Sequence, residues 1–225
     1  MPLKLAETFQ RLPVYLLIDT SGSMAGAPIA AVNEGLRMLE SLLREDPQCR
    51  ETAHISIIRF SSDASQLVPL TDVDSFVAPR LAADGGTALS RGLATLRDAI
   101  SLEMRPRSPQ HPGDFRPIVF LLTDGQPNED DGWREQAKLL MAHKGRRPAY
   151  FVAIGAGPHV DMEVLKELAP SSHYLLADLD PSRLQMLFQW IAMSTVVATR
   201  PAVQLGRGSG PYLAPAPANL FASRP

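Results

Sequence analysis

The feature that most constrains the fold of this chain is a set of short, continuously apolar runs. They span residues 13–18, 117–122 and 149–154, and the first leads directly into an aspartate. A strand that is covered by helices on both faces needs continuous rather than alternating hydrophobicity, as in a parallel sheet. These runs therefore predict the central strands of a mostly parallel sheet.

The segments between the apolar runs carry helical periodicity. Apolar residues recur at helical spacing, and the predicted helices span residues 29–43, 89–100, 133–143, 162–168 and 181–195. Residues 54–60 and 66–70 predict a hairpin that adds one antiparallel edge strand, and residues 172–176 predict a last short strand. The pattern predicts a doubly wound, Rossmann-like α/β domain with a mostly parallel central sheet, one antiparallel edge strand and helices on both faces.

Composition separates a folded part from a tail. Residues 1–199 contain all the alternating strands and helices and are predicted to form one domain. From Arg200 onward the chain carries five prolines and three glycines. Such a segment buries too little apolar surface to offset its ordering entropy. We therefore predict that residues 200–225 form a disordered Pro/Ala/Gly-rich tail, unless a partner holds it.

Charge and cysteine content exclude several classes of protein. Lys and Arg total 22 against 24 Asp and Glu, so no strong basic field favours nucleic acid. The single cysteine, Cys49, excludes an internal disulfide framework and is expected to be a bystander at a polar helix end. No apolar run of about 18 residues predicts a membrane span, and no signal segment is recognised. We expect a cytoplasmic protein without membrane contact.

Polar side chains follow the predicted strand ends, where open parallel sheets collect their ligands. Asp19, Ser21 and Ser23 form a D-x-S-x-S pattern after the first strand, Thr87 precedes a helix, and Asp124 follows another strand. All five offer oxygen, which suits Mg²⁺, and also Mn²⁺ or Ca²⁺, better than Zn²⁺. Two carboxylates and three hydroxyls would leave such an ion able to accept a carboxylate from another molecule.

Together these motifs resemble the metal-ion-dependent adhesion site (MIDAS) of von Willebrand factor type A domains, with the same element order over roughly residues 10–198. Segments 12–24, 85–89 and 120–127 are most similar to the bacterial TerY-like branch associated with tellurium resistance. The resemblance implies that the metal is held by Asp19, Ser21, Ser23, Thr87 and Asp124. It also implies a cytosolic protein that acts beside stress-response kinases, phosphatases and other tellurium-resistance proteins.

The sequence therefore predicts a non-enzymatic, metal-dependent protein–protein interaction module whose divalent cation bridges to an Asp or Glu of a partner. One alternative is a Mg²⁺-dependent phosphohydrolase with Asp19 as the nucleophile. Another is a scaffold whose metal never meets a partner. The chain has neither a G-x-S-x-G elbow nor a Walker A loop to favour other catalysis.

Several polar residues near these motifs have a second interpretation. Thr87 could also serve as a helix N-cap. Asp63 and Asp84 are expected to be turn residues, with partner contact as the alternative. Residues 129–131, three consecutive acids, are expected to cap the helix that begins at Trp133.

Overall fold

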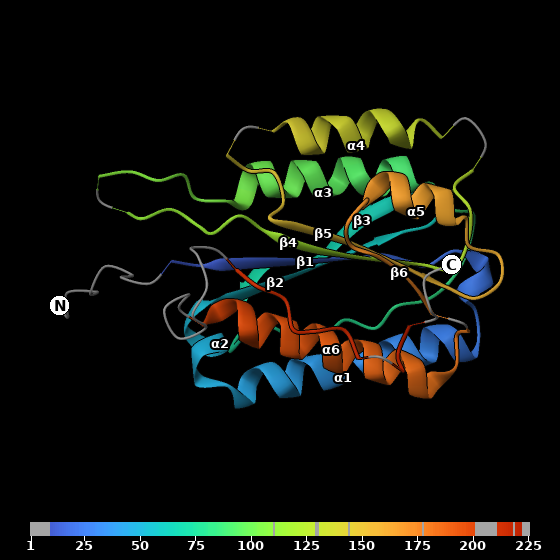
Figure 1. Ribbon diagram of the computed structural model, residues 1–225, viewed down its shortest axis with the longest axis horizontal. Coiled ribbons are helices and arrows are strands. Elements are labelled where there is room, and N and C mark those ends of the chain that lie inside the picture. Colours follow the sequence, from blue (N-terminus) through green and yellow to red (C-terminus); the bar gives the residue numbers. More distant parts are fainter. Residues whose placement is uncertain are drawn as a thin grey trace.

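A six-stranded sheet forms the centre of the computed structural model (Figure 1). The structure describes residues 10–109, 111–128, 131–143, 145–176, 178–200, 211–217 and 219–221. The strands are β1 (Leu12–Asp19), β2 (Ala53–Phe60), β3 (Ala64–Asp72), β4 (Ile118–Thr123), β5 (Tyr150–Ala156) and β6 (His173–Leu176). Their order is β3-β2-β1-β4-β5-β6, and only the β2–β3 pair is antiparallel. The predicted doubly wound sheet with an antiparallel edge strand is confirmed.

Helices cover both faces of the sheet. They are α1 (Ala27–Glu45), α2 (Pro47–Thr52), α3 (Leu89–Glu103), α4 (Trp133–Ala142), α5 (Met162–Leu168) and α6 (Pro181–Thr199), with a short 3-10 turn η1 (Gly22–Met24). Figure 1 shows α1, α2 and α6 on one face and α3, α4 and α5 on the other. All five predicted helices are present, and the last extends to Thr199 rather than ending at residue 195.

Strand β1 shows why the apolar run of residues 13–18 has no polar interruption. All eight of its residues are buried. Leu16 and Ile18 belong to the core cluster under α1 and α6, whereas Tyr15 and Leu17 belong to the cluster under α3. Successive side chains of a strand point to opposite faces, so a strand between two helical layers must be apolar at every position.

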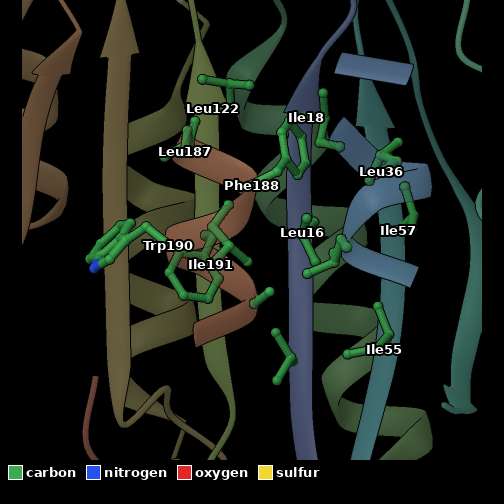
Figure 2. Close-up of a cluster of buried hydrophobic side chains, with 14 of the residues drawn as sticks. Leu16, Ile18, Leu36, Ile55, Ile57, Leu122, Leu187, Phe188, Trp190 and Ile191 are labelled. Carbon is green, nitrogen blue, oxygen red and sulfur yellow. The ribbon is translucent and has the colours of Figure 1, made fainter. Parts of the chain in front are cut away.

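The helix pair α1–α6 packs unusually closely at Gly35. A Cβ atom placed on Gly35 would lie 2.1 Å from Cδ2 of Phe188, far inside contact distance. Figure 2 shows the Phe188 ring projecting from α6 toward Ile18 of β1. The absence of a side chain at Gly35 therefore creates the space that the Phe188 ring fills.

The structure differs from the sequence analysis at Cys49. Asp46 interrupts α1, and its Oδ1 accepts a hydrogen bond of 2.9 Å from the backbone N–H of Cys49, which starts the separate helix α2. Cys49 is completely buried rather than placed at a polar helix end. Burial raises the pKa of its thiol to about 12, so at neutral pH it behaves as an apolar core residue.

Part of the predicted disordered tail is ordered on the domain. Residues 211–217 and 219–221 lie beside α6 (Figure 1), and Leu220 is fully buried in the main core cluster. The average composition of residues 200–225 hides this local apolar content. Residues 201–210, 218 and 222–225 lie outside the described residues, so disorder there and the domain boundary near residue 199 stay predictions.

Replacing Gly35 by alanine tests the close helix contact. Alanine favours an isolated helix by about 1 kcal/mol over glycine, but here its methyl group must displace Phe188. We expect Gly35→Ala to lower the free energy of unfolding by about 1–3 kcal/mol, measured by urea denaturation.

A matched control is Ser41→Ala, at an exposed position of the same helix, which should change stability by less than about 0.5 kcal/mol. Adding Phe188→Leu to Gly35→Ala should recover part of the loss. A Gly35→Ala protein as stable as the wild type would contradict the role assigned to this contact.

Candidate metal centre

The ends of two neighbouring strands bring the candidate ligands together. Strands β1 and β4 are parallel, with Ile18 paired to Leu122, so Asp19 and Asp124 follow at the same edge of the sheet. The chain then turns through η1, which carries Ser23. Topology alone therefore places these three side chains in one region.

A continuous chain of hydrogen bonds connects the ligands predicted on these two strand ends. Oδ1 of Asp19 accepts from the backbone N–H of Ser21 at 2.8 Å. The hydroxyl oxygens of Ser21 and Ser23 lie 3.0 Å apart, and the Ser23 hydroxyl donates to Oδ1 of Asp124 at 2.8 Å. Four of the five predicted residues thus form one cluster of oxygen atoms.

Thr87 lies at the side of this cluster. A Cβ atom placed on Gly125 would lie 3.6 Å from the Thr87 hydroxyl oxygen, so this hydroxyl lies near the residue that follows Asp124. The backbone of Thr87 is held by Asn128, whose Oδ1 accepts from the Thr87 N–H at 3.1 Å and whose N–H donates to the Thr87 carbonyl at 3.0 Å. The structure joins four of the predicted residues by hydrogen bonds and places Thr87 beside them, and the role of all five in metal binding stays a prediction.

The loop before Thr87 is fixed to the first strand end by backbone hydrogen bonds. The N–H of Asp84 donates to the carbonyl of Thr20 at 2.8 Å, and the N–H of Gly22 donates to the carbonyl of Gly85 at 2.9 Å. Gly85 has φ +70°, and a Cβ there would lie 2.5 Å from the Ser62 hydroxyl. Glycine is therefore required at position 85, where the loop before Thr87 passes Ser62 of the loop between β2 and β3.

Burial makes the two carboxylates costly to keep charged. Asp19 has no exposed surface, and its burial raises its pKa to about 6 although Thr123 and Ser21 donate to it. The nearby Asp124 carboxylate raises it further. Burial also raises the pKa of Asp124, against the hydrogen bond from Ser23. Burial therefore outweighs the hydrogen bonds at both carboxylates.

This donor set fits a divalent cation. Two carboxylates and three hydroxyls are hard oxygen ligands, and a cation among them would offset the cost of burying two like charges. In the described residues no group of three or more His, Cys, Asp and Glu side chains has metal-binding geometry. The fit therefore depends on the hydroxyls as much as on the carboxylates.

Two residues that position the cluster were not identified from the sequence. The Thr123 hydroxyl donates to Oδ2 of Asp19 at 2.6 Å and so fixes the carboxylate from the adjacent strand. Asn128 fixes the backbone of Thr87 as described above. A hydroxyl at the end of β4 was a signal for Thr123, but no spacing rule links Asn128 to a residue 41 positions away.

The structure corrects two interpretations of nearby polar residues. The N-cap of α3 is Ala88, so Thr87 is not the cap. Asp131 does not cap α4; its carboxylate instead accepts from the backbone N–H of Ser90 at 2.6 Å and from its hydroxyl at 2.8 Å, at the start of α3. Residues 129 and 130 lie outside the described residues.

Asp63 and Asp84 belong to the loops around the cluster. Asp63 forms an ion pair with Arg59, and the Ser61 hydroxyl donates to Asp84 at 3.3 Å. These contacts agree with the interpretation of both aspartates as turn residues, and partner contact by either one stays untested.

This fold and this site define a class of protein. Its members are α/β domains with a carboxylate–hydroxyl cluster at the carboxyl ends of their central strands. The family model of the von Willebrand factor type A domain matches residues 14–190. The chain belongs to this family, whose members are mostly non-enzymatic adhesion or interaction modules.

Known relatives agree on the fold. The protein sll0103 of Synechocystis sp. is 28% identical over 178 residues, covering 76% of this chain and 39% of the relative. The solved von Willebrand factor type A protein of Catenulispora acidiphila has a TM-score of 0.65 at 19% identity, covering 84% of this chain and 43% of that protein.

A third similar protein is proximal thread matrix protein 1 of the mussel byssus, solved with zinc in its MIDAS motif. Its TM-score is 0.56 at 19% identity, with 81% of this chain and 45% of that protein covered. The chain thus spans less than half the length of each of these three proteins.

The buried charge predicts that Asp19→Asn stabilises the metal-free protein. Asparagine keeps an acceptor for the Ser21 N–H and removes a carboxylate whose pKa is raised from 3.8 to about 6. In EDTA at pH 7 we expect the free energy of unfolding to increase by about 2 kcal/mol. Because folded Asp19 takes up a proton below pH 6, the difference should shrink as the pH falls toward 4.

Urea denaturation in EDTA at several pH values measures both effects. The control is Glu51→Gln, which neutralises an exposed carboxylate and should change neither the stability nor its pH dependence appreciably. Loss of stability in Asp19→Asn at pH 7 would show that the charge of Asp19 is compensated without a metal.

Proposed function

We propose that this chain is a metal-dependent protein-interaction module of the MIDAS type. A divalent cation, Mg²⁺ in the first place and Mn²⁺ or Ca²⁺ as alternatives, is held by Asp19, Ser21, Ser23, Thr87 and Asp124. When bound, the cation supplies a Lewis-acidic position for an Asp or Glu carboxylate of a partner protein. The observation that carries the proposal is the hydrogen-bonded cluster of two buried carboxylates and two serine hydroxyls at one edge of the sheet.

Access to the cluster supports a role in binding. Asp19 and Ser21 are buried, but Ser23, Gly85 and Gln126 are exposed around them. A partner side chain can therefore reach the hydroxyl side of the cluster without rearrangement of the core. Family membership supports the same role, because interaction modules predominate among its members.

The choice of metal follows from the donor atoms. All five side chains offer hard oxygen, and none offers sulfur or imidazole, which favours Mg²⁺ over Zn²⁺. The zinc in the motif of the mussel relative makes Zn²⁺ the competitor that a binding experiment has to include.

The geometry does not favour the phosphohydrolase alternative. A nucleophilic carboxylate needs a second acidic group nearby as acid and base, but position 21 holds a serine, whose hydroxyl lies 3.0 Å from that of Ser23. We therefore assign Asp19 to metal binding.

The TerY-like motifs support a particular biological setting. We propose that the module acts in a bacterial stress-response system of the tellurium-resistance type, in the cytoplasm, with a kinase, a phosphatase or another tellurium-resistance protein as its partner. No helix in the described ranges is long and apolar enough to cross a membrane.

Metal titration is the first test. Calorimetry of the wild-type chain with Mg²⁺, Mn²⁺ and Zn²⁺ should detect one site. Asp19→Ala should abolish binding of Mg²⁺ and Mn²⁺, and Thr87→Ala should weaken it at least tenfold, while Glu51→Ala leaves it unchanged. Circular dichroism should show that Asp19→Ala stays folded, because Asp19 lies outside both apolar clusters. An unfolded Asp19→Ala protein would indicate a structural metal.

Capture of the partner is the second test. Immobilised wild-type chain in Mg²⁺ should retain a protein from the source cell that EDTA elutes, and the Asp19→Ala chain should retain none. Replacing single Asp or Glu residues of the captured protein by Asn or Gln should identify one carboxylate whose loss abolishes binding. Retention that persists in EDTA would contradict the model in which the cation bridges to the partner, but it would not contradict the metal site itself.

A further inference from the structure

A cluster of aromatic side chains lies on α6 and β6. Trp190 of α6 and Tyr174 of β6 form an edge-to-face pair with ring centroids 5.5 Å apart. Figure 2 shows Trp190 on the opposite side of α6 from Leu36, with its indole nitrogen directed away from the core cluster. An edge-to-face aromatic pair with an outward N–H donor is suited to bind a backbone carbonyl.

The chain's own segment 211–221 covers this aromatic pair. The Trp190 indole N–H donates to the carbonyl oxygen of Ala214 at 3.0 Å. Phe221 stacks on Tyr174 with centroids 4.4 Å apart and meets Trp190 edge-on at 5.4 Å. One backbone carbonyl and one terminal aromatic ring therefore fix the two ends of the contact.

The segment has no regular secondary structure, and its residues alternate between contact and solvent. Residues 211–217 have no helix or strand structure. Leu213, Ala214 and Ala216 pack against the core cluster, whereas Pro215 and Pro217 are exposed. The prolines thus contribute by restricting the backbone to an extended conformation before binding, which lowers the entropy lost on docking.

A turn directs the end of the segment back onto the domain. The N–H of Leu220 donates to the carbonyl of Pro217 at 3.1 Å, and the Leu220 side chain is fully buried. The binding pattern, read from residues 213–221, is Leu-Ala-Pro-Ala-Pro-x-x-Leu-Phe.

The attachment resembles a bound peptide more than an element of the fold. Strand β6 is the last strand of the sheet, and residues 211–217 do not extend the sheet beyond it. The contact instead uses side-chain packing and the hydrogen bond from Trp190, as aromatic grooves do when they recognise proline-rich peptides. Eleven residues, 200–210, separate the segment from α6 in the sequence.

We propose that the Trp190–Tyr174 surface is a peptide-binding groove that this chain occupies with its own residues 211–221. Its external ligand is a protein segment of the pattern Leu-Ala-Pro-Ala-Pro-x-x-Leu-Phe, which binds by displacing residues 211–221. The groove does not depend on the metal cluster. An experiment that disproves the groove therefore leaves the proposed function unaffected.

The test uses the full chain and a fluorescein-labelled peptide with the sequence of residues 211–221, followed by fluorescence anisotropy. In the wild type the tethered segment competes at high effective concentration, so the labelled peptide should bind weakly. Phe221→Ala in the chain weakens the internal competitor but leaves the groove intact. We expect this variant to bind the peptide at least about tenfold more tightly than the wild type.

Two controls establish that binding is specific. Adding Trp190→Phe to the Phe221→Ala chain keeps an aromatic ring, removes the N–H donor and should weaken peptide binding about three- to tenfold. A peptide with Leu220→Ala and Phe221→Ala should not bind. A folded Phe221→Ala chain that binds neither peptide, or both equally, would overturn the proposal.

A second measurement avoids substitutions in the groove. A protease site is inserted between Leu205 and Gly206 of the full chain, and the cut protein is incubated with excess labelled peptide. Exchange of the released fragment for the peptide, with circular dichroism unchanged, supports a groove. A fragment that never exchanges, or a domain that unfolds on cutting, overturns it, because the segment is then an integral part of the core.

Discussion

The functional site depends on the parallel pairing of β1 with β4, which brings two buried carboxylates to the same edge of the sheet. The serine hydroxyls and Thr123 hold these carboxylates by hydrogen bonds but carry no positive charge to balance them. The fold thus keeps an arrangement that costs stability in the absence of a cation. The proposed metal binding and the energetic cost would thus arise from the same geometry, which is common where active groups are buried.

The fold was predictable because its main signals are local and redundant. Strands β1, β4 and β5 each contain a continuous apolar run, and each long helix repeats its apolar residues at helical spacing, so the order of elements follows from the sequence alone. The elements that escaped prediction are short. Helix α2 depends on the cap by Asp46, and η1 has three residues, too few for any periodic signal.

Four of the candidate ligands were predictable because they follow strand ends and the fifth, Thr87, because it precedes a helix, whereas their supports were not predictable. Thr123 and Asn128 act through hydrogen bonds to residues far away in the sequence, and only the folded chain brings those partners together. Asp131 was assigned to the wrong helix for the same reason. An acidic residue just before a helix is expected to cap that helix, here α4, but the folded chain brings Asp131 to Ser90 at the start of α3. Composition likewise failed for residues 211–221, because a few well-placed aromatic contacts outweigh a proline-rich average.

The Phe188 ring seated against Gly35 limits how α6 can move. Because the glycine leaves a notch the size of one ring on the surface of α1, a small axial slide of α6 would drive the ring into the flanking turns of α1. Gly35 is the only glycine of α1, so a shift of α6 by one helical turn would press the ring against larger side chains, and the contact fixes a single register between the two helices.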